Sequence, residues 1–212
     1  MDVVVIGGGI GGLAAALRLG RSGHRVRVLE RDGAAPPPRA DDAFAAWPRR
    51  GVPQWDLYHV FGARVRKELA AHAPDVIERL VAAGAADRDL SWVVADDPAP
   101  HDDELRVLVV RRPVMEWALR TAVAATHGVE LLAGMTATGL ATEGGRVVGV
   151  TAGGDGWSAD VVIDAAGRRS PVRGWLAATG VTVPATERSP CGIAYYSRYF
   201  RLRDGVELPP VR

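Results

Sequence analysis

The chain has 212 residues, of which 48% are apolar, so it can bury a core as one large domain or one and a half small ones. Its 26 basic and 25 acidic residues are interspersed and give a net charge of +1, which argues against an electrostatic nucleic-acid or membrane-surface binder. The single cysteine, Cys191, excludes an internal disulfide framework and a cysteine metal cluster.

No apolar run is long enough to span a bilayer. The first predicted strand begins at Asp2, so we expect no signal peptide and a cytoplasmic protein. We also expect no metal site, because four histidines show no mutual ligand spacing: His24, His72, His101 and His127.

Residues 2–30 predict a strand, a turn, a helix and a second strand. The β-branched run Asp2–Ile6 is typical of a buried parallel strand, Ile10–Gly20 has helical composition, and Arg25–Glu30 predicts the next strand. This β-α-β unit is the usual beginning of a doubly wound α/β domain.

The turn in this unit fits the pattern G-x-G-x-x-G with Gly7, Gly9 and Gly12. The first glycine allows a tight turn, the second lets a pyrophosphate approach the backbone, and the third lets helix and strand pack closely. Glu30 ends the second strand, where a carboxylate can accept hydrogen bonds from ribose hydroxyls. Together these features predict a dinucleotide site with the pyrophosphate at the helix N-terminus.

The next part of the chain predicts a long loop, helices and a buried strand. The expected elements, in order, are a loop over 31–55, a helix over 57–72 capped by Asp56, a helix over 76–83, a strand over 91–95, a polar turn over 96–103, a strand over 105–110, and a helix from Arg112 to about 127 with Pro113 in its first turn.

Short strands follow. We expect them near 129–132, over 135–142 and over 146–151, with Gly144 and Gly145 as a hairpin turn between the last two. A buried strand over 160–165, a short helix over 171–178 and an alternating strand over 191–202 complete the chain. The expected fold is a Rossmann-like α/β domain with an inserted β-meander over 1–180. The beginning of a mixed-sheet substrate domain follows over 181–212. In an alternative division, residues 74–104 also belong to this substrate domain.

Three further stretches carry motifs. The first is Arg49-Arg50-Gly51-Val52-Pro53-Gln54, the second is the strand-to-helix segment 110–119 around Arg112, and the third is 160–173, with Asp164 two residues before Ala166 and Gly167 after it. A guanidinium at the N-terminus of a helix opposes the helix dipole, so a bound anion would account for Arg112 there.

With the N-terminal unit, these stretches resemble the FAD-dependent monooxygenases of the aromatic-hydroxylase superfamily, and most closely the bacterial FAD-binding oxidoreductases and epoxidases. The resemblance implies FAD as cofactor and NAD(P)H as electron donor. It implies these cofactor-binding residues: Gly7, Gly9, Gly12, Glu30 on the adenosine ribose with Arg31 beside it, Arg49 on the phosphates, Val52 near the isoalloxazine, Arg112 on the phosphate or ribityl chain, and Asp164 and Gly167 near the pyrophosphate.

The same resemblance implies that reduced FAD reacts with O2 to a C4a-(hydro)peroxide, which transfers one oxygen atom to an aromatic or alkene small molecule. No side chain need act as nucleophile, so no catalytic residue is assigned. Four residues are candidates to face flavin or substrate: Arg50, Gln54, Trp55 and His59.

Alternatives remain open. A flavin dehydrogenase or reductase acting on an isoprenoid or polyketide would use the same fold, and a nucleotide-binding module without catalysis belongs to another class. A halogenase is disfavoured because the only lysine, Lys67, lies in a predicted helix without a matching motif. The family's third FAD motif, G-D-A, is absent after residue 170, so we expect a fragment, a remnant or a chain that a second polypeptide completes.

Overall fold

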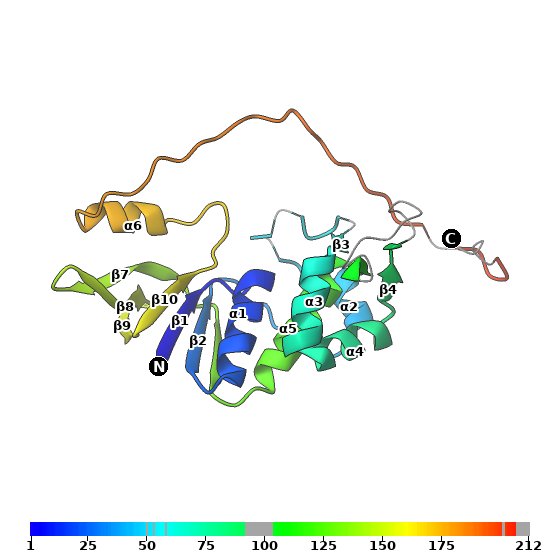
Figure 1. The fold of residues 1–212 in the computed structure, drawn as a ribbon, viewed down its shortest axis with the longest axis horizontal. Coiled ribbons are helices and arrows are strands. Elements are labelled where there is room, and N and C mark those ends of the chain that lie inside the picture. Colours follow the sequence, from blue (N-terminus) through cyan, green and yellow to red (C-terminus); the bar gives the residue numbers. More distant parts are fainter. Residues whose placement is uncertain (50, 53, 58, 92–103, 201, 207–212) are drawn as a thin grey trace.

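A four-stranded parallel sheet forms the centre of the protein, in the order β10-β1-β2-β6 (Figure 1). The computed structural model describes residues 1–49, 51–52, 54–57, 59–91, 104–200 and 202–206. The strands of this sheet are β1 (Asp2–Ile6), β2 (Arg25–Glu30), β6 (Val129–Ala133) and β10 (Val161–Asp164).

Alternate residues of β1 face two different layers. Val3 and Val5 pack with Ala16 of the first helix, whereas Val4 and Ile6 pack with Val150 and its neighbours in the meander. Because both faces of β1 are covered, its uninterrupted apolar run has a physical reason. The meander consists of β7 (Ala137–Glu143), β8 (Arg146–Ala152) and β9 (Asp155–Ser158), beside which lies α6 (Val172–Ala178).

Helices cover the opposite face of the parallel sheet. The helix α5 lies between α1 and the pair α3 and α4, and its residues Met115 and Leu119 are completely buried there with Leu13. The bounds of these helices are α1 (Ile10–Arg21), α3 (Ala63–His72), α4 (Pro74–Ala82) and α5 (Arg112–Ala124).

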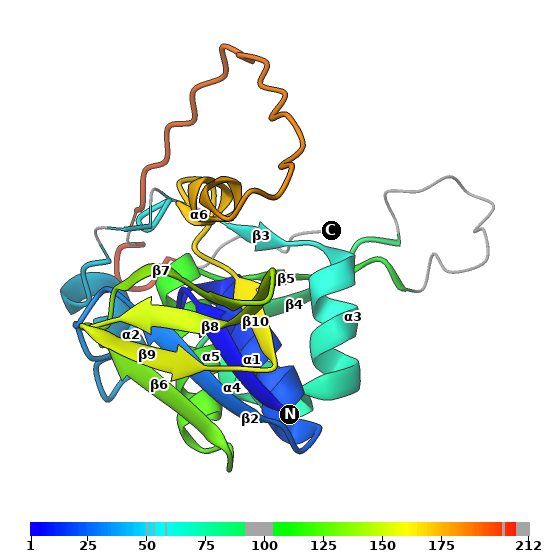
Figure 2. The same ribbon diagram turned by 90° about the vertical axis from the view of Figure 1, so that its left-hand side faces the viewer.

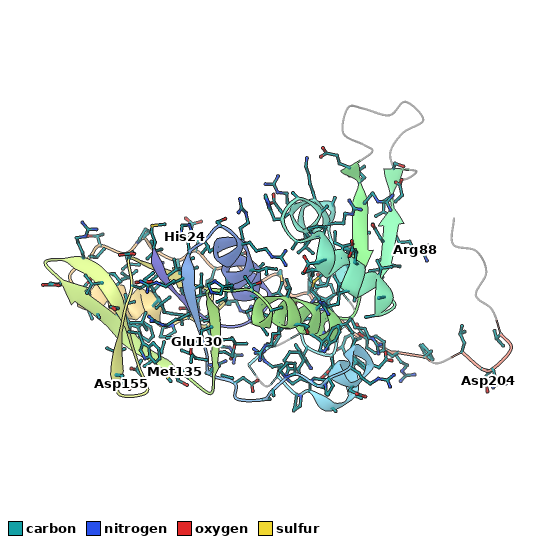
Figure 3. The ribbon with its side chains drawn as sticks, turned by 90° about the horizontal axis from the view of Figure 1, so that it is seen from below. His24, Arg88, Glu130, Met135, Asp155 and Asp204 are labelled. Carbon is teal, nitrogen blue, oxygen red and sulfur yellow. The ribbon has the colours of Figure 1, made fainter. Side chains whose placement is uncertain are left out.

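A small antiparallel sheet lies beyond these helices, in the order β3-β5-β4. Its strands are β3 (Val60–Phe61), β4 (Ala86–Asp89) and β5 (Arg106–Val109), and the short helix α2 (Ala40–Ala46) packs on α5. Figure 3 shows the elongated arrangement: Met135 and Asp155 lie at the meander end, whereas Arg88 of β4 and Asp204 lie at the other.

The predicted α/β fold with its inserted meander is confirmed, with several local corrections. The loop expected over 31–55 contains α2, and the helix expected over 57–72 begins only at Ala63, because residues 60–61 pair with β5 and Gly62 is the N-cap. The strand expected over 91–95 lies, apart from Ser91, outside the described residues, and β4, four residues long, was not predicted. The strand β9 was not predicted.

The strand expected over 191–202 is wrong for the residues that the structure describes there. Residues 181–200 leave α6 as an extended segment that loops away from the body and returns near α2 (Figures 1 and 2). Tyr199 contacts Phe44 of α2 edge-to-face at 4.9 Å, while Tyr196 and Phe200 are 95% and 83% exposed. A strand forms only where another strand supplies its ladder hydrogen bonds, and no described strand runs alongside. The division into domains 1–180 and 181–212 stays a prediction.

Candidate dinucleotide site

The glycine turn between β1 and α1 is closely packed at two positions and open at the third. Gly7 has a φ of +103°, and a Cβ added to it would lie 2.6 Å from the carbonyl oxygen of Ala165. A Cβ on Gly12 would overlap the carbonyl oxygen of Gly7. A Cβ on Gly9 would meet no atom within 4 Å, so this is where a ligand can approach the backbone.

The N-terminus of α1 offers partial positive charge that no acidic residue of its own first turn compensates. Gly9 is its N-cap and makes no side-chain cap, and its first turn contains no acidic residue. The N–H groups of a first helical turn have no partner within the helix, and the helix dipole adds partial positive charge there. An anionic pyrophosphate fits this position.

The parallel sheet brings the predicted site residues to one edge. Because all four strands run parallel, their carboxyl ends share that edge, where ligands of such sheets bind. There Gly7 donates its N–H to Leu29 O at 2.8 Å, and Ala165 donates to Ile6 O at 2.8 Å. Asp164, which accepts from the Ala166 N–H at 3.1 Å, and Gly167, with a φ of +78°, follow at the end of β10.

Glu30 lies at this edge but is only 5% exposed. Its Oε2 accepts from the Gly8 N–H at 2.8 Å, and its Oε1 accepts from the Asp32 N–H at 2.8 Å. Arg49 donates a third hydrogen bond, from Nη2 to Oε2 at 2.9 Å. The carboxylate predicted to bind ribose is thus held in a defined orientation by the glycine turn, the following loop and one arginine.

Arg49 is the centre of a buried charge cluster. Besides Glu30, its guanidinium pairs through Nε with Asp32 Oδ2 at 3.1 Å and through Nη1 with Glu116 Oε1 of α5. Its side chain is 3% exposed, and the ring of Trp47 lies 5.7 Å from its Cζ. In this arrangement the guanidinium faces three carboxylates; its predicted contact with the FAD phosphates stays a prediction.

Glu116 and Arg120 were not among the predicted site residues, although their spacing was informative. Arg112, Glu116 and Arg120 lie four residues apart in the helix predicted to begin at Arg112, so they share one face of α5. Glu116 is completely buried and Arg120 is 2% exposed. Charged residues are rarely buried without partners, so a repeating charged face on an otherwise apolar helix predicts an internal ion-pair cluster.

The loop after β2 is fixed by side chains from two neighbouring elements. Trp47 donates its indole N–H to Ala34 O at 3.2 Å, and Trp117 of α5 donates to Pro37 O at 2.9 Å. Arg120 also reaches Ala34 O, at 3.5 Å. These contacts hold residues 31–37 against α5, so the loop keeps Asp32 beside Arg49.

Two other predicted cofactor residues lie close to this loop. A Cβ on Gly51 would lie 2.7 Å from Arg31 Nη2, so the arginine side chain passes directly over that glycine. Val52 is partly buried against Trp47 and Trp55. Arg112 is the first residue of α5, and burial lowers the pKa of its guanidinium, an effect that Glu116 opposes and Arg49 reinforces. Each role toward FAD stays a prediction.

The four candidates for contact with flavin or substrate are only partly gathered. A cavity of about 700 Å³ is lined by residues 44–49, 52 and 55–57, and it includes Trp55, which packs edge-to-face on Trp47 at 5.2 Å. Gln54 is exposed and does not line it. His59 lies apart, with Nδ1 2.9 Å from Leu57 O and its ring stacked on Phe61 at 5.8 Å. Arg50 lies outside the described residues.

Burial raises the pKa of the Glu116 carboxyl, although the positive charges of Arg49, Arg120 and Arg112 oppose this. The native state therefore binds a proton at Glu116 at a pH where the unfolded chain has lost it. The contribution of Glu116 to stability consequently falls as the pH rises from its ordinary pKa through the raised native value. Glu116→Gln removes this titration, so we expect the variant to gain stability relative to wild type as the pH increases from about 4 to 8.

Urea unfolding of both proteins across this range measures the difference. Other carboxyls with shifted pKa values do not affect this difference, because they are the same in both proteins. Hydrogen bonding to Arg21 lowers the pKa of Asp75. Burial raises the pKa of Asp87, but hydrogen bonds and charges from Arg66 and Arg106 lower it overall. Exposed Glu78→Gln is the control, with a difference within about 0.5 kcal/mol throughout. If the unfolding free energies of Glu116→Gln and wild type changed with pH in the same way, the expectation would be wrong.

Within the described residues, no helix is long and apolar enough to cross a membrane. No group of three or more histidine, cysteine, aspartate or glutamate residues is placed to hold a metal ion in that same part of the chain.

The fold and the site define a dinucleotide-binding α/β protein. Residues 2–112, more than half of the chain, match the family model described as FAD dependent oxidoreductase. The chain therefore belongs to the FAD-dependent oxidoreductase family, which confirms the resemblance found in its motifs, and FAD is the cofactor of this family.

Similar proteins are about twice as long. Protein Rv3254 of Mycobacterium tuberculosis is 31% identical over 226 aligned positions, which cover 96% of this chain and 45% of that protein. The structure of pqsL, a probable FAD-dependent monooxygenase from Pseudomonas aeruginosa, superposes with a TM-score of 0.62 at 19% identity, over 90% of this chain and 47% of that one.

The p-nitrophenol 4-monooxygenase PnpA from Pseudomonas putida shares the fold with a TM-score of 0.55 at 19% identity, over 82% of this chain and 42% of that one. The myxobacterial chondrochloren halogenase CndH does so with a TM-score of 0.58 at 23% identity, over 82% and 38%. The chain thus spans about half the length of the relatives it matches, and the likeness to these structures concerns the fold.

The residues present fit FAD. Open space at Gly9 and the uncapped N-terminus of α1 suit the pyrophosphate, and Glu30 lies where a ribose hydroxyl would arrive. In the charge cluster around Arg49, several buried polar atoms lack a hydrogen-bond partner among the described residues: Glu116 Oε2, Arg120 Nε and Nη2, and Arg112 Nε. Such orphaned groups are costly unless a bound molecule or water satisfies them.

Proposed function

We propose that the chain binds FAD and forms part of a monooxygenase that transfers one oxygen atom from O2 to an aromatic or alkene small molecule, with NAD(P)H as electron donor. The observation that carries the cofactor assignment is the glycine turn, packed at Gly7 and Gly12 and open at Gly9, beside the fixed carboxylate of Glu30. Bound reduced FAD supplies the electrons that reduce O2; one oxygen atom enters the substrate and the other leaves as water.

The chain's own residues would bind and orient the cofactor. The N-terminus of α1 would bind the pyrophosphate, Glu30 would accept from a ribose hydroxyl, and Arg112 at the start of α5 would face the phosphate or ribityl chain. The aromatic residues at the 700 Å³ cavity, Trp47 and Trp55, suit an apolar ring or alkene.

The first test is retention of FAD and its dependence on Gly9. Purified chain is mixed with FAD and desalted, and the flavin absorption bands are recorded; a dissociation constant follows from flavin fluorescence. Gly9→Ala adds a Cβ that meets no protein atom, so folding should be unchanged. The methyl group enters the space needed by the pyrophosphate, so we expect FAD affinity to fall at least about tenfold.

Gly174→Ala is the matched control, because its Cβ also meets nothing within 4 Å and it lies in α6, away from the glycine turn. We expect wild-type affinity for this variant. Wild-type chain that is folded but retains no FAD, or equal affinity for Gly9→Ala and Gly174→Ala, would overturn the proposed site.

The reaction type has its own test. NAD(P)H oxidation, O2 uptake and incorporation of ¹⁸O from ¹⁸O2 are measured with aromatic and alkene compounds. Product labelled with ¹⁸O supports a monooxygenase. Substrate conversion without the label would indicate the dehydrogenase or reductase alternative acting on compounds such as isoprenoids or polyketides. A cytoplasmic location stays a prediction.

A nucleotide-binding module that a second polypeptide completes is the second candidate. It is favoured by the extended segment after α6, in which Ile193, Tyr195 and Tyr196 are more than half exposed. Exposed apolar residues so close together are typical of an interaction surface. FAD retention without NAD(P)H oxidation or O2 uptake would support this candidate over an enzyme active by itself.

A further inference from the structure

A continuous series of contacts connects the glycine turn to the middle of α5. The Gly8 N–H donates to Glu30 Oε2 at 2.8 Å, Arg49 Nη2 donates to the same oxygen at 2.9 Å, and Arg49 Nη1 pairs with Glu116 Oε1. Glu116 does not itself reach the open space at the turn, because it is completely buried. Among the described residues, its ion-pair contact toward this end of the sheet is with the guanidinium of Arg49.

The contacts to Glu30 limit what its carboxylate can accept. An ionised carboxylate offers about four acceptor positions. Three are filled, by the N–H groups of Gly8 and Asp32 and by Arg49. One position remains, so in this arrangement Glu30 can accept from one ribose hydroxyl and not from two.

Several parts of the chain bring charged groups to Glu116. Arg112 and Arg120 lie one turn away on α5, Arg49 approaches from the loop before residue 51, Glu30 from the end of β2, and Asp32 follows β2 on the other side of Arg49. The set holds three cations and three carboxylates. The positive and negative charges of this set are equal in number only while Glu116 is ionised. Among the described residues of the set, only Arg49 forms ion pairs with both α5 and β2.

We infer that Glu116 is a positioning residue of the nucleotide site: it holds Arg49 against Glu30 and thereby restricts Glu30 to a single ribose hydroxyl. This inference rests on the proposed FAD binding. An arginine side chain has many rotamers, so its position depends on the groups that bind both ends of the guanidinium fork. Without the carboxylate on Nη1, Arg49 is free to leave Glu30, and the orientation of Glu30 toward the ribose is lost.

The ligands ADP, 2′-deoxy-ADP and 3′-deoxy-ADP test this directly, because they differ only in the hydroxyls that Glu30 would accept. Their dissociation constants are measured by titration calorimetry with the complete 212-residue chain. A hydrogen bond to a charged group changes affinity by about tenfold or more. For wild type we expect one deoxy analogue to bind at least about tenfold more weakly than ADP, and the other to bind within about threefold of ADP.

Glu116→Gln should reduce this selectivity to about threefold or less, because the amide keeps the shape of Glu116 but not its charge. Glu78→Gln, on the exposed side of α4, should keep the wild-type selectivity. A purely structural role for Glu116 would lower the melting temperature without changing the ratio of affinities. The ratio therefore separates positioning from general stability.

The double variant Arg49→Met/Glu116→Met keeps the test valid if Glu116→Gln does not fold, since replacing a buried pair by apolar groups of similar volume is often tolerated. It too should show little selectivity. Wild-type selectivity in either variant, or a penalty for both deoxy analogues in wild type, would overturn the inference and leave the proposed function intact. Absence of ADP and FAD binding by folded wild type would overturn both.

Discussion

Arg49→Ala is expected to destabilise the protein by about 3–5 kcal/mol, because it leaves three carboxylates at one buried site without their shared cation. Glu30, Asp32 and Glu116 all pair with this guanidinium, whose side chain is only 3% exposed. Removing one member of a buried ion pair exposes the remaining charge to the full cost of desolvation. Urea denaturation of wild type and variant measures the loss of unfolding free energy at neutral pH.

The pH dependence of this loss identifies its cause. As the pH falls and Glu116, whose pKa is raised by burial, becomes protonated, it no longer needs a counter-charge, so the deficit of Arg49→Ala should shrink in acid. Arg25→Ala is the control, because Arg25 pairs with Asp2 at the surface with its side chain 79% exposed, and its loss should cost at most about 1 kcal/mol. Equal, small effects of the two substitutions would show that the buried cluster contributes little.

Gly12→Ala should produce the second large effect, a loss of at least about 2 kcal/mol together with weakened FAD binding. The added Cβ would overlap the carbonyl oxygen of Gly7, which is backbone and cannot rotate away as a side chain could. Helix α1 would have to move from β1, and the turn that should receive the pyrophosphate would move with it. Denaturation midpoints and flavin fluorescence titration measure the two consequences.

Gly11→Ala offers a stringent comparison because it concerns the adjacent residue of the same helix. A Cβ at Gly11 meets nothing within 4 Å, and alanine favours the helix over glycine, so this variant should be more stable by up to about 1 kcal/mol. Opposite signs for the two substitutions are the expected result. A destabilised Gly11→Ala, or a neutral Gly12→Ala, would mean that close approach does not explain the glycine at position 12.

Elements with a strong local pattern were predicted nearly to the residue. The strands Asp2–Ile6 and Arg25–Glu30 match the structure, and the helix after the glycine turn differs by one residue at its end. Gly144 and Gly145 form the expected hairpin turn, both with positive φ. These elements depend on residues close together in the sequence, so their pattern is sufficient to predict them.

Elements that depend on distant partners were predicted less well. Residues 60–61 became a strand because β5 supplies their hydrogen bonds, whereas the alternating residues after Cys191 remain without a described partner strand. The short helix α2 formed inside a stretch rich in proline and alanine, where it packs on α5. In each case the deciding contacts come from another part of the fold.

The sequence by itself determined the nucleotide-binding unit and the family, because glycine spacing, apolar runs and the acid at residue 30 act within about thirty residues. Only the tertiary structure decided which groups Arg49 pairs with: α5, which begins about eighty residues after β2, brings Glu116 to this arginine and Arg120 to the loop after β2, where Glu30 and Asp32 supply the other two carboxylates. The physical reason is that burial makes charges choose partners by distance in space, since an unpaired charge costs most where water is excluded.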